Sequence, residues 1–306
     1  MERFSFLKSR LWQDVYLGEL GPDCATMKPP RRFTLDNRGS YPNGWTRDSR
    51  AIIFSSNRSG KSEVFKQGLN DSVGEAVVQG PEDSYNAGLS PDGSWMLYEQ
   101  SPPTTHAAPS SPHRLVRRPI AGGSPEFVLE EPAGMSWDYG CPLKPGAACV
   151  LRQQEGKDFA FYSLDPVRGK GEPLGKIEAS ASGYFTGWSV SPDGSRLALV
   201  RSADKYKGRI EVLTFSDRAW HELAVEHEQG DLQSIAWAAG GNGFFVTSWS
   251  PDSFNLLQVT LAGKVKPLLR NGHRLWMWHP LPSPDGKYLA FQAQTSDSNV
   301  WLLEGF

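Results

Sequence analysis

The chain has 306 residues, of which 39% are hydrophobic and 22% charged, as in an ordinary globular protein. A formal net charge of -2 argues against the basic surface of a nucleic-acid-binding domain and against a polybasic membrane patch. No apolar run reaches the roughly 18 residues of a transmembrane helix, and the N-terminus lacks a signal-peptide pattern. We therefore expect a cytoplasmic protein, or a periplasmic one if the chain is a fragment of a longer membrane-anchored protein.

One short pattern recurs along the chain: a turn, an apolar strand, a polar turn and a second apolar strand. The first turn reads Ser-Pro-Asp-Gly at residues 90–93, 191–194 and 283–286, and residues 46–49 form a copy that has lost the proline. Proline presets φ in such a turn, aspartate bonds the nearby backbone and glycine accepts positive φ. We therefore expect these aspartates to be structural, not ligands for a metal or substrate.

Four strands are expected in each repeat. The first clear strand is predicted at residues 4–7, 51–54, 95–98, 148–151, 197–200, 244–247 and 288–291. The second is predicted at residues 15–17, 64–66, 115–118, 159–162, 210–213, 256–259 and 300–303. A weaker strand closes most repeats, near residues 33, 77, 127–129, 174, 223 and 268–269. Another opens the next repeat, near residues 45, 89, 143, 188, 237 and 280, and no segment has a helical period.

Four antiparallel strands per unit of about 45 residues are typical of a β-propeller blade. The pattern predicts one all-β propeller domain over residues 1–306. Seven blades are favoured, at residues 1–40, 41–80, 81–132, 133–179, 180–228, 229–272 and 273–306. Six blades, with one terminal segment redundant, are the alternative. The first predicted blade lacks its opening strand and the last lacks its closing strand, so the chain is a fragment or a ring closed imperfectly by residues 1–10.

Three cysteines are too few for a disulfide scaffold. Cys141 and Cys149 flank one predicted hairpin turn. We favour two small buried thiols at these positions, with a cross-strand disulfide as the alternative.

The stretch from Gly44 to Phe65 resembles the repeat of TolB-type propellers. That repeat has a tryptophan before a Ser-Pro-Asp-Gly-type turn, an apolar strand, Ser-x-Arg-x-Gly and a second strand. Residues 186–200 and 278–291 repeat its first half, and the resemblance covers nearly the whole chain, although the turns at residues 144–146 and 238–241 are degenerate. The resemblance is specific for the fold and weak for function.

Proteins with this repeat include a periplasmic partner of a peptidoglycan-associated lipoprotein, C-terminal halves of bacterial regulators and kinases, and gating propellers of prolyl-oligopeptidase-like peptidases. The C-terminal segment, residues 299–303, resembles the regulator type. The resemblance thus implies a sensor or scaffold module of a larger bacterial regulator.

Catalytic motifs are weak in this sequence. Residues 55–62 end in Gly-Lys-Ser, but a phosphate-binding loop needs a following helix, and a strand is predicted there. Residues 122–125 form a turn, not the nucleophile elbow of a hydrolase. The six histidines have no zinc-ligand spacing, and His273 and His279 are expected to have packing or hydrogen-bonding roles. We predict no cofactor, no metal and no catalytic residue.

Binding at the loop-rich face is the favoured function. The loops that precede the opening strands are aromatic and surround the expected channel, so they could form a binding funnel. Residues 101–113, rich in Pro, Ser and Thr, are expected to form a long flexible loop near it. The candidate ligand-binding residues are Tyr41, Arg47, Trp137, Asp138, Tyr139, Tyr184, Trp276, Trp278 and His279.

We thus predict a non-catalytic, monomeric module that binds a protein, a peptide or a small ligand, without nucleic-acid contact or a membrane span. The alternative is a metal-assisted lyase or hydrolase with its site at the channel. That alternative requires histidine, glutamine or carboxylate side chains on successive opening strands, where the sequence places Trp45, Leu89, Trp188 and Trp237. A purely structural propeller is the third possibility.

Overall fold

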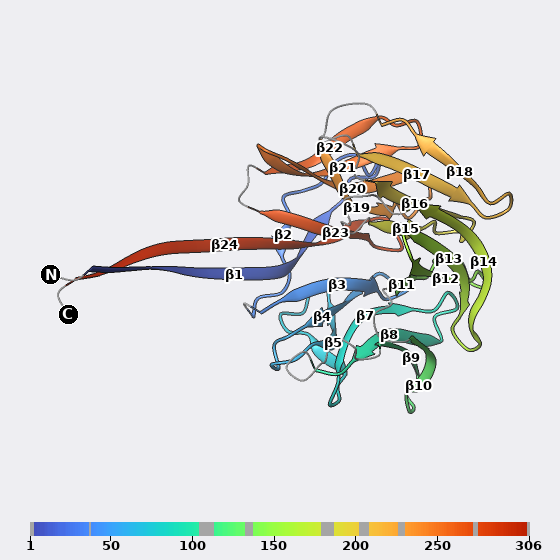
Figure 1. The fold of residues 1–306 in the computed structure, drawn as a ribbon, viewed down its shortest axis with the longest axis horizontal. Coiled ribbons are helices and arrows are strands. Elements are labelled where there is room, and N and C mark those ends of the chain that lie inside the picture. The colour runs from blue at the N-terminus through green and yellow to red at the C-terminus, as the bar shows by residue number, and fades with distance from the viewer. Residues whose placement is uncertain are drawn as a thin grey trace.

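The computed structural model describes residues 3–36, 38–103, 113–131, 137–178, 187–201, 208–225, 230–271 and 275–304. In these ranges every element of regular secondary structure is a β-strand. The strands form six four-stranded antiparallel sheets arranged as a ring (Figure 1). The all-β propeller with four-stranded blades is confirmed. The propeller has six blades, which was the alternative prediction, and the favoured prediction of seven blades is wrong. No helix in the described ranges could cross a membrane.

Five blades are built from consecutive strands, in the order in which the chain visits them. Their strands are β3(Ser40–Trp45), β4(Ala51–Ser56), β5(Glu63–Gly68) and β6(Glu75–Val78); β7(Asp83–Leu89), β8(Trp95–Ser101), β9(His113–Pro119) and β10(Glu126–Glu131); β11(Trp137–Gly140), β12(Cys149–Glu155), β13(Asp158–Asp165) and β14(Gly169–Glu178); β15(Trp188–Val190), β16(Arg196–Arg201), β17(Arg209–Thr214) and β18(Ala219–Leu223); and β19(Asp231–Trp237), β20(Gly243–Ser250), β21(Ser253–Thr260) and β22(Val265–Asn271).

The sixth blade is shared between the two ends of the chain. Its inner strands are β23(Trp276–Pro282) and β24(Tyr288–Glu304), and its outer strands are β1(Arg3–Glu19) and β2(Arg31–Arg32). β1 pairs with β24 over 17 residues of each strand, from Arg3 opposite Glu304 to Glu19 opposite Tyr288. The ring is therefore closed by hydrogen bonds between the chain ends, no terminal segment is redundant, and the predicted first and last blades are two halves of one blade.

The overcount has a local cause. β1 contains two of the predicted strands, at residues 4–7 and 15–17, and β24 contains two more, at residues 288–291 and 300–303. The sequence pattern predicts turns in the polar stretches between them, residues 8–14 and 292–299. Neither stretch contains glycine or proline, which are the residues that make tight turns, and both continue as strand.

The repeated turns have the hydrogen bonds that their composition predicts. In residues 90–95, the Asp92 carboxylate accepts hydrogen bonds from the Ser90 hydroxyl and the Ser94 backbone N–H, and Gly93 has φ of +74°. Residues 191–196 and 283–288 repeat this arrangement through Asp193 and Asp285. The hydroxyl donors lower the pKa of Asp92 to about 2. The structural role expected for these aspartates is thus observed.

Apolar side chains of neighbouring blades form the core between them. One cluster joins Ile53, Val64 and Val78 of one blade to Met96 and Tyr98 of the next. Each such side chain contributes roughly 1.5–3 kcal/mol when it is fully buried. Because every blade covers the face of its neighbour, the ring is held together without helices.

Cys141 and Cys149 form a disulfide with an S–S distance of 2.00 Å, so the favoured expectation of two free thiols is wrong. Gly140 at the end of β11 pairs with Val150 on β12. The two cysteines are the next facing pair along this hairpin, and their Cα atoms lie 4.2 Å apart. Adjacent antiparallel strands therefore supply the short separation that a disulfide needs.

Candidate functional site

The innermost strand of each blade lines the central channel. These strands are β23, β3, β7, β11, β15 and β19. Contacts across a blade boundary join β3 to β7 and to β23, and join β19 to β15 and to β23. The six strands are the opening strands of the sequence repeat. Their register with the second strand of each blade determines which side chains face the channel.

In the described part of the chain, four innermost strands are interrupted by a β-bulge that carries a polar residue. The register of β3 shifts between Pro42 and Gly44, that of β7 between Tyr85 and Gly88, that of β19 between Leu232 and Ser234, and that of β23 between Trp278 and Leu281. Bulges redirect side chains and are common beside functional sites. The polar residues at the four bulges are Asn43, Asn86, Gln233 and His279.

Two of the bulge residues have a costly backbone conformation. Asn86 has φ of +48° and His279 has φ of +50°, a left-handed region that non-glycine residues seldom adopt. Such conformations cluster at binding and catalytic sites, where the surrounding structure stabilises them. We therefore regard the bulges of β7 and β23 as the first candidates for a functional role.

A cavity of about 140 Å³ occupies the channel beside the bulges of β3 and β7. Asn43 and Asn86 lie in its wall, and Arg47, Leu143 and Pro284 lie at the turns that follow the innermost strands. Binding sites for drug-sized ligands measure about 300–1,000 Å³. The channel therefore has room for a small group, such as one side chain or a chain terminus.

Glu99 is a buried acid beside the channel. Only 5% of its surface is exposed, and the Asn86 amide donates a hydrogen bond of 2.5 Å to its carboxyl group. Burial raises the pKa of Glu99 to about 8, and the nearby Asp138 carboxylate adds to that shift. Glu99 is therefore mostly protonated at pH 7, so that it is neutral and can itself donate a hydrogen bond.

Asp138 and Arg152 form an ion pair next to this acid. Two guanidinium nitrogens of Arg152 lie 2.8 Å from the two carboxylate oxygens of Asp138, and the Trp188 indole donates to Asp138 at 2.9 Å. The Arg152 side chain is only 5% exposed, that of Asp138 24%. Burial raises the pKa of Asp138, and the Arg152 guanidinium opposes that rise. The charges of Asp138 and Arg152 therefore compensate each other.

His279 and an aromatic cluster lie on the opposite side of the ring, on or near β23. The Trp276 ring stacks on Phe254 with centroids 5.0 Å apart, and Trp278 lies 5.6 Å from Trp276. The His279 backbone N–H donates to Ser234 at 3.2 Å. The side chain of His279 is exposed, yet the protein around it lowers the pKa of its imidazole by desolvation. We take this histidine as neutral at pH 7.

Arg47 lies at the far end of the channel from the expected funnel. Its guanidinium donates to the backbone oxygens of Leu143, Ser90 and Pro91, and so joins the turns of three blades. This places Arg47 at the turns after the innermost strands, not among the loops before them. Leu143, expected in an opening strand, lies in the turn after β11.

Replacement of Arg47 by alanine is expected to lower the free energy of unfolding by about 2–3 kcal/mol, because hydrogen bonds from a charged group to three carbonyls are lost. Chemical denaturation with urea measures this change. Arg50→Ala, at an exposed position of the same turn, is the matched control and should have little effect. Equal effects of the two substitutions would show that Arg47 does not join the blades.

The other candidate residues divide into exposed and buried groups. Tyr41 and Trp276 are 38% and 45% exposed, at the loop end of β3 and β23. Trp137 and Tyr139 are core residues between two blades, and the Tyr139 hydroxyl lies 2.7 Å from the carbonyl oxygens of Asn86 and Leu97. Tyr184, His273 and most of the 101–113 insertion lie outside the described residues.

Sequence reasoning missed Asn43, Asn86, Gln233 and Glu99. The opening strands were expected to present only Trp45, Leu89, Trp188 and Trp237 to the channel, and this argued against polar chemistry there. A signal exists in the sequence around Asn43 and Asn86. They stand one and two residues before a glycine, and two and three residues before the apolar residue that ends the strand. Residues 57–62 join β4 to β5 by a turn, and a strand follows the Gly-Lys-Ser sequence, as expected.

No protein-family profile and no curated protein matches this sequence. Among solved structures, putative TolB from Agrobacterium tumefaciens is similar with a TM-score of 0.64 at 16% identity, over 93% of this chain and 98% of that one. TolB from Acinetobacter baumannii is similar with a TM-score of 0.60 at 13% identity, over 92% of this chain. This chain spans 63% of the length of that TolB chain.

An oligogalacturonate lyase from Vibrio parahaemolyticus is also similar, with a TM-score of 0.53 at 12% identity, over 94% of this chain and 98% of that one. Identities this low carry information about the fold and none about the ligand. The sequence repeat, the six blades and the structural similarity agree. By fold, this chain is a TolB-like six-bladed β-propeller.

Proposed function

We propose that this propeller is a non-catalytic binding module that takes the end or a side chain of a partner polypeptide into its channel. The observation that carries this proposal is the set of bulges that brings Asn43, Asn86, Gln233 and His279 to the innermost strands. Amide and imidazole groups at these positions can donate to and accept from a peptide backbone. The aromatic side chains of Tyr41 and Trp276 supply exposed contact area at the starts of β3 and β23.

The size and charge of the channel support a peptide over a free small molecule. A cavity of about 140 Å³ is smaller than the roughly 300–1,000 Å³ of typical small-molecule sites. The protonated Glu99 and the internal Asp138–Arg152 pair add little net charge to the wall, which suits uncharged backbone groups. Arg47, which also lines the cavity, donates to backbone carbonyl oxygens. Within this proposal, the module is the sensor or scaffold part of a larger bacterial regulator, for which the sequence resemblance is the support.

Selection of peptides from a displayed library on the immobilised protein tests the proposal, followed by calorimetric titration of a selected peptide. His279→Gly should weaken binding at least about 10-fold, a loss of about 1.4 kcal/mol. Glycine tolerates the φ of +50° at this position, so the melting temperature should stay the same or rise.

Ser49→Gly is the matched control. Ser49 also has positive φ, +59°, but lies in the turn after β3, so its replacement should leave peptide affinity unchanged. Equal loss in both variants would mean that backbone change, not the imidazole, affects binding. A melting-temperature rise with metal ions or sugars, and none with peptides, would overturn the peptide proposal in favour of another ligand class.

A further inference from the structure

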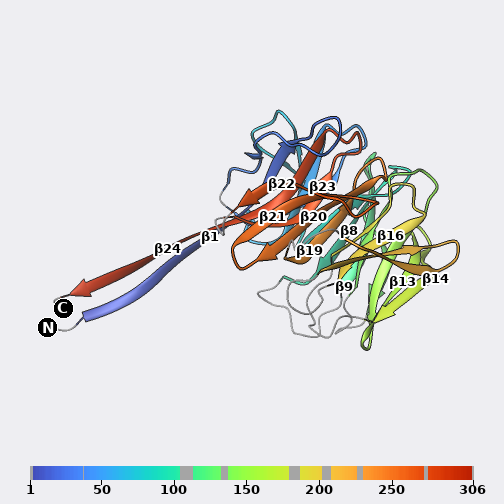
Figure 2. The same cartoon turned by 90° about the horizontal axis from the view of Figure 1, so that it is seen from above.

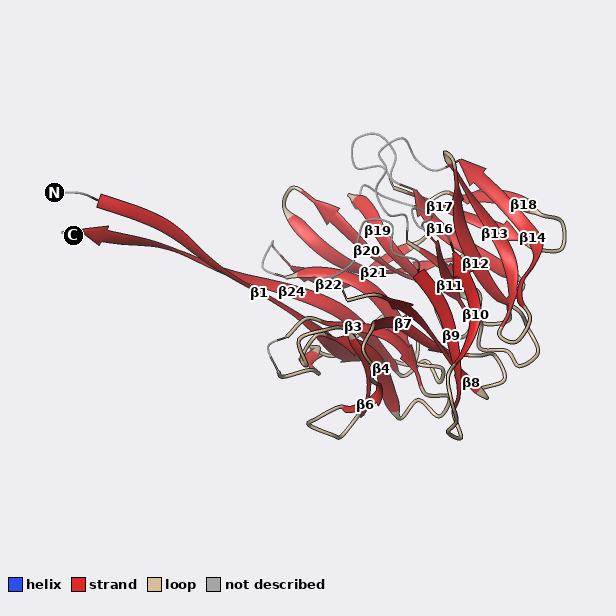
Figure 3. Ribbon diagram, turned by 60° about the horizontal axis from the view of Figure 1, so that its bottom comes forward, coloured by secondary structure: helices blue, strands red, loops and turns tan. Residues whose placement is uncertain are grey.

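The distal halves of β1 and β24 leave the propeller as a two-stranded ribbon, which comprises residues 3–12 and 295–304. In all three views the ribbon extends beyond the ring and carries both chain ends at its tip (Figures 1, 2 and 3). β1 pairs with β2 only at Tyr16 and Leu17, and β24 pairs with β23 only up to Gln294. Each ribbon strand therefore has the other as its only partner strand among the described residues.

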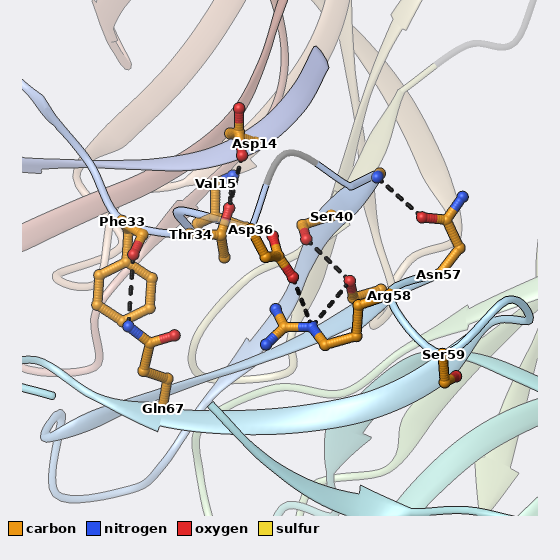
Figure 4. Close-up of polar contacts among 12 residues, drawn as sticks. Asp14, Val15, Phe33, Thr34, Asp36, Ser40, Asn57, Arg58, Ser59 and Gln67 are labelled. Carbon is orange, nitrogen blue, oxygen red and sulfur yellow. Dashed lines mark hydrogen bonds and ion pairs between the residues drawn. The ribbon is translucent and has the colours of Figure 1, made fainter. Parts of the chain in front are cut away.

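The base of the ribbon is firmly fixed to the ring. Asp14 is buried, and its carboxylate accepts a hydrogen bond from Arg32 at 3.0 Å. It also accepts one from the Thr34 hydroxyl at 3.1 Å (Figure 4). Two residues after Thr34, the Asp36 carboxylate forms an ion pair with Arg58, whose Nε lies 2.7 Å from Oδ2 (Figure 4). Gln13 bonds Gln294 across the ribbon at 2.8 Å. The ribbon thus leaves the body from an ordered polar junction, in a defined direction.

The ribbon exposes apolar side chains that a two-stranded sheet cannot bury by itself. Leu7, Leu11, Val300 and Leu302 are 66%, 63%, 76% and 57% exposed. Two-stranded ribbons are marginally stable in water, and contiguous apolar patches on a surface mark interaction sites.

One face of the ribbon has the shape to fit a copy of itself. Directly opposed residues share a face, and the register is continuous, so Leu7 lies beside Val300 and Ser9 beside Ser298. The large side chains of Leu7 and Val300 form a ridge. Ser9 and Ser298 form a gap beside it, and their hydroxyl groups are hydrogen-bonded to each other at 2.9 Å. Between residues 5 and 13 this face carries no charged residue on either strand. Alternation of large and small side chains permits dry interdigitation between stacked sheets.

We infer that two copies of the chain dimerise by stacking these ribbon faces about a two-fold axis. The Leu7–Val300 ridge of each copy fills the Ser9–Ser298 gap of the other, so the axis passes midway between the two pairs. A two-fold interface uses the same patch on both subunits, and this face is complementary to itself. The inferred dimer departs from the monomer expected from the sequence.

The size of the ribbon sets the expected strength of the dimer. The ribbon has ten residue pairs, with a rise of about 3.4 Å per residue and two strands about 4.8 Å apart. When two ribbons stack, their faces can therefore bury a total surface on the order of 1,000 Å², which is the lower limit for a specific interface. We therefore expect a dissociation constant in the micromolar range. In the stacked pair, the tip of each ribbon reaches the base of the other, near the exposed Tyr41 and Trp276 of that copy.

Sedimentation velocity of the whole chain, from about 1 to about 300 µM so as to span micromolar affinity, tests the inference. The wild type should shift from monomer to dimer over this range. Leu7→Lys and Val300→Lys should each raise the dissociation constant at least about 10-fold, because a charge would be buried in the interface. The side chains of Leu7 and Val300 are exposed in the single chain, so neither substitution should lower the melting temperature.

Trp301→Lys is the matched control, since Trp301 neighbours Val300 but points to the other face of the ribbon, opposite Phe6. This variant should dimerise like the wild type. A wild type that remains monomeric at every concentration overturns the inference. Equal weakening by Trp301→Lys and Val300→Lys, or a dimer unaffected by Leu7→Lys and Val300→Lys, overturns it as well.

Discussion

Replacement of Asp138 by alanine is expected to destabilise the propeller by about 3 kcal/mol, within the range for breaking a buried ion pair from one side. The Arg152 guanidinium is 5% exposed, so the protein cannot compensate for the lost carboxylate with bulk water. The Trp188 indole loses its acceptor in the same substitution. Urea denaturation at pH 7 followed by tryptophan fluorescence measures the change.

An exposed pair provides the comparison for this effect. Lys157 and Glu178 lie 2.7 Å apart, but their side chains are 80% and 60% exposed, and such pairs contribute little. Glu178→Ala should therefore leave the denaturation midpoint unchanged. Asp138→Asn, which keeps an acceptor for Trp188, should lose less stability than Asp138→Ala. Similar midpoints for Asp138→Ala and Glu178→Ala would contradict the structural weight given to the Asp138–Arg152 pair.

Glu99 should make the stability of the wild type depend on pH. Its pKa of about 8 in the folded chain lies above the ordinary value of 4.5, so the folded state binds more protons than the unfolded state between these values. Its contribution to stability is fully present below about pH 4.5 and is lost as the pH rises through 8, with a slope of up to about 1.4 kcal/mol per pH unit. Between pH 5 and 8 the loss amounts to about 3 kcal/mol.

Glu99→Gln removes this titration and leaves an oxygen that can accept the hydrogen bond from Asn86. The difference in unfolding free energy between this variant and the wild type, measured by urea denaturation at half-unit pH steps, should grow in favour of the variant from pH 5 to pH 8. Glu222→Gln, at an exposed position on β18, should track the wild type. Parallel curves for Glu99→Gln and the wild type would show that Glu99 ionises normally in the folded chain.

The candidate site could be predicted only in part. The aromatic residues expected around the channel include Tyr41 and Trp276, which are exposed at the starts of β3 and β23. The polar residues of the channel were missed because a bulge changes the register by one residue, and a one-residue change moves a side chain to the other face. Arg47 was expected near the rim because side-chain direction has no signature in sequence, whereas the structure directs it to three carbonyl oxygens at the opposite end.

The sequence by itself determined the all-β class, the four-stranded repeat and the turns, because Pro-Asp-Gly chemistry and strand alternation act over a few residues. It did not determine the number of blades or the closure of the ring. These depend on pairing between residues such as Tyr16 and Phe291, which are distant along the chain and leave no local pattern. The Cys141–Cys149 disulfide and the Glu99–Asp138–Arg152 cluster were also decided by the tertiary structure, since only the packing of neighbouring strands and blades brings these side chains within bonding distance.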